Sequence, residues 1–133
     1  MNKVTMKGCE WLALVQMADM LVKCPKEMIV FFENSGEATV FGTAVGRIEN
    51  AMPKGTAADS SIAVLFDEAE HDLLGRLADW FEELLIEHSY FLMKKDPEFF
   101  RKHWNRVGTI KHSFHHAKHS DTETKSDAAD GSR

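Results

Sequence analysis

The sequence predicts an α+β domain with the element order α-β-β-β-α-α, in which a small three-stranded antiparallel sheet has helices packed on one face. Three observations predict this fold class. Apolar residues recur at helical spacing near the N-terminus and again in the second half of the chain, β-branched and aromatic runs lie between them, and turn-forming residues separate these runs. With 133 residues, the chain has the length of one domain with one hydrophobic core.

The first predicted helix covers residues 8–23. Its apolar side chains recur at steps of three and four residues, namely Trp11, Leu14, Val15, Ala18 and Val22. Pro25 cannot continue the helix, because it lacks a backbone N–H donor and its ring clashes with the preceding turn. We therefore expect a largely buried helix that ends shortly before Pro25.

Lysines precede this apolar stretch, as they do in secretory signal peptides. However, Glu10, Gln16 and Asp19 interrupt the stretch, and no small-residue cleavage site follows it. No apolar run in the chain reaches the roughly 18 residues of a membrane-spanning helix. We therefore expect a cytoplasmic protein without a membrane partner.

Three β-strands are predicted after this helix. Residues 28–33 form an apolar run, and residues 38–48 resume strand character after an Asn-Ser-Gly turn. Residues 49–60 contain asparagine, proline and glycine and are predicted to form a loop. Residues 61–66 are predicted to be the third strand, which is apolar enough to lie at the centre of the sheet.

A long second helix is predicted from Asp67 to about Leu92. Asp67 followed by Glu70 is typical of an N-cap residue with a reciprocal acidic partner. Leucines form the buried stripe of this helix, and acidic residues form its solvent-exposed face. The pattern therefore predicts an amphipathic helix that packs on the sheet.

A third helix is predicted to begin at Asp96, which is followed by a proline at the first helical position. Gly108 is predicted to end it as a left-handed C-cap. The expected domain then covers residues 1–108, and residues 109–133 are expected to form a flexible tail that is rich in histidine and polar residues.

Charge is distributed unevenly along the second half of the chain. Residues 67–90 contain eight acidic residues and one basic residue, whereas residues 91–119 contain seven basic and two acidic residues. Either these segments lie side by side and neutralise one another, or they form a dipolar surface that steers charged partners. We favour the second interpretation, in which the long helix presents its acidic face to a basic partner protein. The residues expected to contact this partner are Asp72, Asp79, Glu82, Glu83 and Glu87.

The sequence contains no catalytic signature. The serines at positions 60 and 61 lie outside any nucleophile-elbow motif, and the glycines at positions 42 and 46 lie inside a predicted strand rather than in a phosphate-binding loop. We therefore expect a non-enzymatic interaction module of the inhibitor, immunity or adaptor type, without a cofactor. An exposed edge of the small sheet would also allow a homodimer.

A first alternative function is nucleic-acid binding by the segment 94–119. This segment alternates lysines and arginines with aromatic rings, a mixture that suits phosphate contact combined with base stacking. A nucleic-acid-binding accessory protein would use Lys102, Trp104 and Arg106 for these contacts.

A second alternative is metal binding by a histidine cluster. Its members recur at steps of three and four residues, namely His112, His115, His116 and His119. On a helix they would project from one side, a spacing that suits coordination of Zn²⁺, Ni²⁺ or Cu²⁺ by imidazole nitrogens. The other interpretation is a polar tail whose positive charge rises below about pH 6.5.

Overall fold

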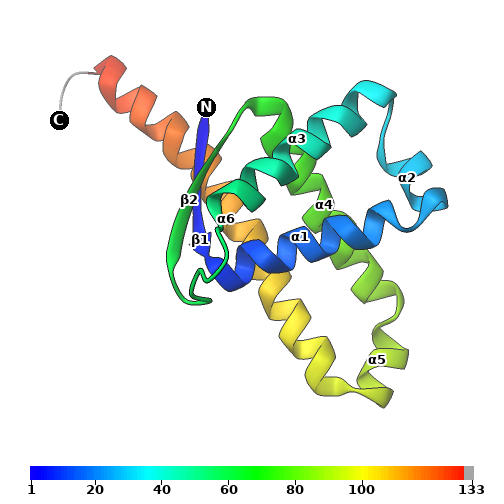
Figure 1. The fold of residues 1–133 in the computed structure, drawn as a ribbon. Coiled ribbons are helices and arrows are strands. Elements are labelled where there is room, and N and C mark those ends of the chain that lie inside the picture. Colours follow the sequence, from blue (N-terminus) through cyan, green and yellow to red (C-terminus); the bar gives the residue numbers. More distant parts are fainter. Residues whose placement is uncertain (131–133) are drawn as a thin grey trace.

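The computed structural model describes the backbone of residues 1–130 and the side chains of residues 1–117. This part of the chain is a mixed α+β fold, mostly helical, with six helices and one two-stranded antiparallel sheet (Figure 1). The elements in chain order are β1 (Asn2–Lys7), α1 (Gly8–Val22), α2 (Pro25–Phe31), α3 (Ser35–Ala51), β2 (Ser61–Phe66), α4 (Glu68–Glu87), α5 (Ser89–Lys95) and α6 (Pro97–Asp130).

The sheet joins the N-terminus to the middle of the chain. Strands β1 and β2 run antiparallel, in a register that pairs Asn2 with Phe66 and Lys7 with Ser61. Strand β1 is absent from the predicted elements, although its polar and apolar residues alternate as in a half-buried strand, and every second side chain is buried. Strand β2 confirms the strand predicted at residues 61–66, but with one neighbour it is not central.

Residues 38–48 belong to helix α3, so the strand predicted there is wrong. Asn34 provides the N-cap of this helix, because its Oδ1 accepts a hydrogen bond from the backbone N–H of Glu37 at 3.0 Å. Phe41 and Ile48, which are seven residues apart and share one helical face, are both buried. Helical periodicity therefore outweighs the valine and threonine content that predicted a strand.

The strand predicted at residues 28–33 is also wrong, because helix α2 covers most of this segment. Pro25 occupies the first turn of α2, a position where its missing N–H costs nothing. Ile29 and Val30 are exposed, whereas Phe31 is buried. The preference of β-branched residues for strands depends on having a sheet surface to pack against, and here they have none.

The two predicted helix starts in the second half of the chain are confirmed. Asp67 and Glu70 form the expected capping box of α4, with a backbone-to-side-chain hydrogen bond of 2.8 Å in each direction. The Asp96 side chain accepts a hydrogen bond from the N–H of Phe99 at the start of α6. The long helix, however, is divided at His88 into α4 and the short α5.

Helix α6 continues through Gly108, so the helix end predicted there is wrong. Gly55 is the one residue with a positive φ in the described part of the chain, so Gly108 does not adopt the left-handed conformation of a C-cap. The helix continues because Ile110 and Phe114 extend its apolar stripe into the core. The predicted boundary between residues 108 and 109 thus falls inside α6. For residues 118–133, the predicted tail lies outside the described side chains.

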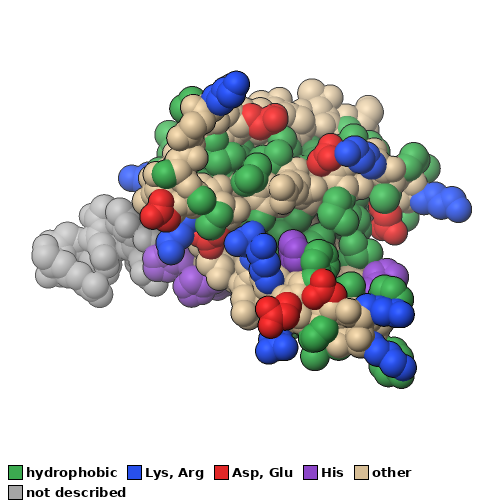
Figure 2. Space-filling view, turned by 60° about the horizontal axis from the view of Figure 1, so that its bottom comes forward, with side chains coloured by type: hydrophobic (Ala, Val, Ile, Leu, Met, Phe, Trp, Pro, Cys, Tyr) green, Lys and Arg blue, Asp and Glu red, His purple; other side chains and the backbone are tan. Residues whose placement is uncertain are grey.

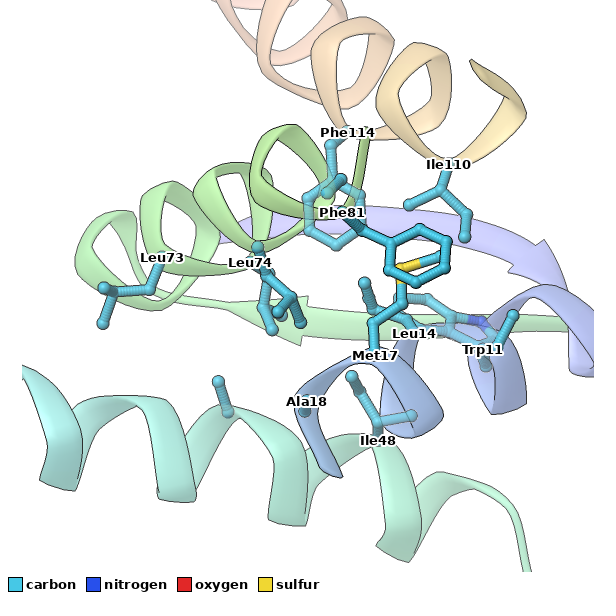
Figure 3. Packing of buried hydrophobic residues seen from close by; sticks show 14 of the residues in the cluster. Trp11, Leu14, Met17, Ala18, Ile48, Leu73, Leu74, Phe81, Ile110 and Phe114 are labelled. Atoms are coloured by element: carbon cyan, nitrogen blue, oxygen red, sulfur yellow. The ribbon is translucent and has the colours of Figure 1, made fainter. Parts of the chain in front are cut away.

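The hydrophobic core lies where the sheet, α1, α3, α4 and α6 meet, and the labelled side chains of these helices belong to one cluster (Figure 3). Trp11 is fully buried, and its indole N–H donates a hydrogen bond to the carbonyl oxygen of Ile62 at 2.9 Å. Its ring lies 5.8 Å from that of Phe66 and 6.2 Å from that of Phe114. Because α6 supplies one of these rings, it is part of the core and not an appendage.

Candidate interaction surfaces

Two of the five predicted acidic contact residues form ion pairs with the same lysine. Lys111 of α6 places its Nζ 3.0 Å from Asp79 Oδ1 and 2.9 Å from Glu82 Oε1 on α4. The hydrogen bonds that Lys111 donates to the carboxylates of Glu82 and Asp79 raise its pKa. At these positions, the acidic and basic helices do lie side by side and neutralise one another. The Asp79 side chain nevertheless remains 60% exposed, so it can still accept a second cation.

The other predicted acidic residues differ in their surroundings. Asp72 is exposed, lines a cleft between α4 and α6, and has an interaction partner. Glu83 and Glu87 are exposed and have no hydrogen-bond or ion-pair partner within the described part of the chain. They lie four residues apart and therefore share one face of α4. The acidic face that remains available to a partner is thus centred on the C-terminal half of α4.

Large apolar side chains are exposed close to these two glutamates in the sequence. Ile86 is 53% exposed, Tyr90 is 80% exposed and Phe91 is 59% exposed. We call Glu83, Ile86, Glu87, Tyr90 and Phe91 the α4–α5 patch. Helix α5 contains no buried residue. Figure 2 shows how apolar side chains reach the surface between charged ones on one face of the molecule.

The apolar part of this patch is not among the predicted site residues. The signal was present in the sequence, because Tyr90 and Phe91 follow directly on a polar Glu-His-Ser segment that interrupts the leucine stripe. A continuous helix would have turned His88 and Leu92 toward the core, whereas His88 is exposed and Leu92 is half-buried. The helix breaks at His88, and no residue of α5 after the break is buried.

The residues predicted for nucleic-acid binding lie on different sides of α6. Lys102 and Arg106 line a groove against α1 and the loop before β2. Trp104 stacks on Phe100, with ring centroids 5.8 Å apart, and lines a separate hollow. Residues two positions apart on a helix point in nearly opposite directions. The two cations are therefore together, and the exposed aromatic ring is not beside them.

The predicted histidine cluster is also divided. His112 and His116 stack with ring centroids 6.0 Å apart, whereas His115 lines the cleft between α4 and α6. Among the described residues, no three histidine, cysteine or acidic side chains are grouped in a way that could hold a metal ion. The side chain of His119 lies outside the described residues.

The cleft between α4 and α6 has a volume of about 500 Å³ and is lined by charged residues. Its cations are Lys111, paired as described above, and Arg76, whose guanidinium donates to Glu37 at 3.0 Å and to the carbonyl oxygen of Phe31 at 3.0 Å. The hydrogen bond with Glu37 raises the pKa of Arg76 and lowers that of Glu37. These charges thus join α2, α3, α4 and α6 rather than forming an open reactive site.

None of the helices in the described part of the chain combines the length and the hydrophobicity needed to cross a bilayer. The chain matches no protein-family model, no curated protein and no solved structure.

Proposed function

We propose that this chain is a non-enzymatic interaction module that binds a basic, partly apolar segment of another protein on the α4–α5 patch. The observation that carries the proposal is the exposure of Ile86, Tyr90 and Phe91 beside two carboxylates without an internal partner. Clustered exposed apolar side chains are typical of protein interfaces, where large aromatic residues contribute most of the binding energy.

The short helix α5 supports the same proposal. It has seven residues and buries none of them, and a helix of this length is unstable in water without packing. In the free chain, its position depends on the flanking helices, because its cation-π contact between Lys94 and the ring of Tyr90 lies within α5 itself. A partner that covered Tyr90 and Phe91 would supply the missing packing.

The charge of the patch defines the chemistry of the partner. Glu83 and Glu87 offer two carboxylates on one helical face, and lysine or arginine side chains of the partner would neutralise them. Charge complementarity of this kind mainly accelerates and orients association, whereas burial of the apolar residues supplies affinity. Inhibitor, immunity and adaptor proteins act by such binding, and we place the chain in this class.

The proposal can be tested by crosslinking followed by titration. A photo-crosslinking amino acid at position 90 should capture a protein partner in the native host, and the same amino acid at Thr43, which is exposed on α3, should not. The captured protein is then purified and titrated with the whole chain. Glu83→Lys combined with Glu87→Lys should weaken this binding at least about ten-fold, which corresponds to about 1.4 kcal/mol.

The matched control reverses two charges elsewhere. Glu33→Lys combined with Glu49→Lys changes the net charge equally on an unrelated surface, where both glutamates are exposed. This control should leave the dissociation constant within about two-fold of the original. Equal weakening by both pairs would show that net charge alone matters, and no weakening by the first pair would refute the proposed surface.

A further inference from the structure

We propose that the groove formed by α1, the loop before β2 and α6 binds a small organic anion, with its oxyanion on Lys102 and Arg106 and its apolar part on α1. This groove has a volume of about 440 Å³. Small-molecule sites in proteins have volumes of about 300–1,000 Å³, an apolar lining and a few polar groups that fix the ligand. The site is separate from the α4–α5 patch.

The charge of the groove has one sign. Lys102 and Arg106 are four residues apart on α6, and no acidic residue lines the groove. Neither cation has an ion-pair partner within the described part of the chain. Like charges at this helical spacing repel one another, and an anion between them would remove the repulsion. A phosphate or carboxylate could accept charge-assisted hydrogen bonds from both side chains.

The neighbouring His103 reports the same positive potential. Burial, followed by the charges of Lys102 and Arg106, lowers the pKa of this imidazole. The positive charges of Lys102 and Arg106 therefore also act on this neighbouring ring.

The side of the groove that the loop forms is fixed in the free chain by backbone hydrogen bonds. The loop is attached to the start of α1 by hydrogen bonds from the N–H of Gly8 to Ser60 and from the N–H of Cys9 to Ala58, at 2.9 and 2.8 Å. A Cβ atom at Gly8 would lie 2.7 Å from the carbonyl oxygen of Ala57, so only glycine permits this close approach. Since these N–H groups are already bonded, they do not contribute to ligand binding.

The remaining lining is suited to the body of an organic ligand. Leu12 and Met52 provide apolar surface, and Leu12 is about half exposed in the free chain. Gln16, one turn further along α1, offers an amide donor. An inorganic ion would use only the cations, whereas an organic anion would also cover the leucine.

The test uses the whole, isotope-labelled chain and follows amide shifts during titration with four probes. The probes are inorganic phosphate, adenosine monophosphate, octanoate and a single-stranded oligonucleotide. We expect saturable shifts around Leu12, Thr56 and Arg106 with one organic anion, at an affinity at least about ten-fold higher than for inorganic phosphate. Adenosine monophosphate and octanoate separate a phosphate from a carboxylate head group.

Two pairs of variants then locate the site. Lys102→Gln combined with Arg106→Gln should weaken binding of that anion at least about ten-fold, while the long glutamine side chains keep much of the packing. Lys94→Gln combined with Lys95→Gln removes the same charge from α5 and should leave affinity within about two-fold. Leu12→Ser should weaken binding of the organic anion and leave binding of inorganic phosphate unchanged.

Four outcomes would overturn the proposal. The first is the absence of saturable shifts with every probe, and the second is an equal loss of affinity in the two double variants. The third is binding of inorganic phosphate as tight as that of the organic anions, and the fourth is binding of the oligonucleotide that is tighter than that of the organic anions. The third outcome would show an adventitious ion only. The fourth would assign the cations to nucleic acid.

Discussion

Glu70 shows how one buried carboxylate positions two helices. It is 1% exposed, and its Oε1 accepts a hydrogen bond from the N–H of Asp67 at 2.8 Å. Its Oε2 lies 2.7 Å from Nε of Arg47, which is at the C-terminal end of α3. The same side chain therefore takes part in capping the N-terminus of α4 and links α3 to α4 through an ion pair.

We expect Glu70→Ala to lower the free energy of unfolding by about 1–3 kcal/mol, because the Asp67 N–H loses its acceptor and Arg47 loses its partner. The loss stays moderate because the Arg47 side chain is 41% exposed and can be hydrated. Denaturant unfolding measures the difference. Glu49→Ala, at an exposed position of α3, is the control and should change stability by less than about 0.5 kcal/mol. Equal effects of the two substitutions would contradict the role of Glu70.

Glu37 should make the stability of the folded chain depend on pH in the acidic range. Its hydrogen bond with Arg76, followed by the one from the N–H of Glu33, lowers its pKa in the folded chain. A lowered pKa contributes stability that is complete above the unfolded value, near pH 4.3, and that is lost as the pH falls through the folded value. Melting temperatures of the original chain and of Glu37→Gln, measured from about pH 6 down to pH 3, should therefore converge as the pH falls. A difference that is constant with pH would contradict this interpretation.

At the scale of elements, the uninterrupted course of α6 can be tested at one glycine. Gly108 lies in the helix without a positive φ, and a Cβ atom there would meet no atom within 4 Å. We expect Gly108→Ala to raise the free energy of unfolding by about 0.5–1 kcal/mol, since alanine has the higher helix propensity. A left-handed C-cap would make the same substitution destabilising, so the sign of the change in unfolding experiments distinguishes the two structures.

Phe114 provides the complementary test of α6 as a core element. It is 3% exposed, and its ring contacts the rings of Trp11 and Phe66. We expect Phe114→Ala to cost about 3–5 kcal/mol, the range for removing a buried aromatic side chain. If residues after Gly108 formed a loose tail, the cost would be below about 0.5 kcal/mol.

The sequence predicts the elements that follow one strong periodicity or one clear cap, and fails where two signals conflict. The capping pattern at Asp67 correctly places the start of α4, and the equivalent pattern at Asn34 and Glu37 marks the start of α3. At α3, however, the Asn-Ser-Gly segment also indicates a turn, and the valines and threonines after it predict a strand. A β-type run becomes a strand only when a neighbour completes its hydrogen bonds, and local sequence does not contain that information.

The candidate surface shows the same limit. The period of α4 correctly places Glu83 and Glu87 on the exposed face, because exposure within one helix is a local property. The pairing of Glu82 with Lys111 is not local, since these residues are 29 positions apart. It also requires α6 to continue past Gly108. Which carboxylates remain available therefore depends on the tertiary structure.

At the scale of the whole molecule, the described helices differ in how firmly they are packed. Helices α1 and α4 each contribute several buried residues to the core, α2 contributes Phe31, and α5 contributes none. Segments with few buried contacts open locally at a small free-energy cost, whereas core segments open only with the whole domain.

Native-state hydrogen exchange should reproduce this order. We expect the amides of α5 to exchange fastest among the six helices and those of α1 and α4 to exchange near the rate of global unfolding. The proposed partner should slow exchange in α5 upon binding, whereas a ligand of the groove on α6 should not. Uniform protection of α5 and α4 in the free chain would contradict the assignment of α5 as a surface element.

The pairing of β1 with β2 has a consequence for biosynthesis. The first strand leaves the ribosome with Val4 and Met6 ready to pack, yet the residue opposite Val4 is Val64, sixty positions later. At about 5–20 residues per second, translation needs several seconds to deliver that partner. For this interval β1 lacks its partner strand, and a chaperone that shields residues 2–7 would protect the nascent chain from aggregation until β2 emerges.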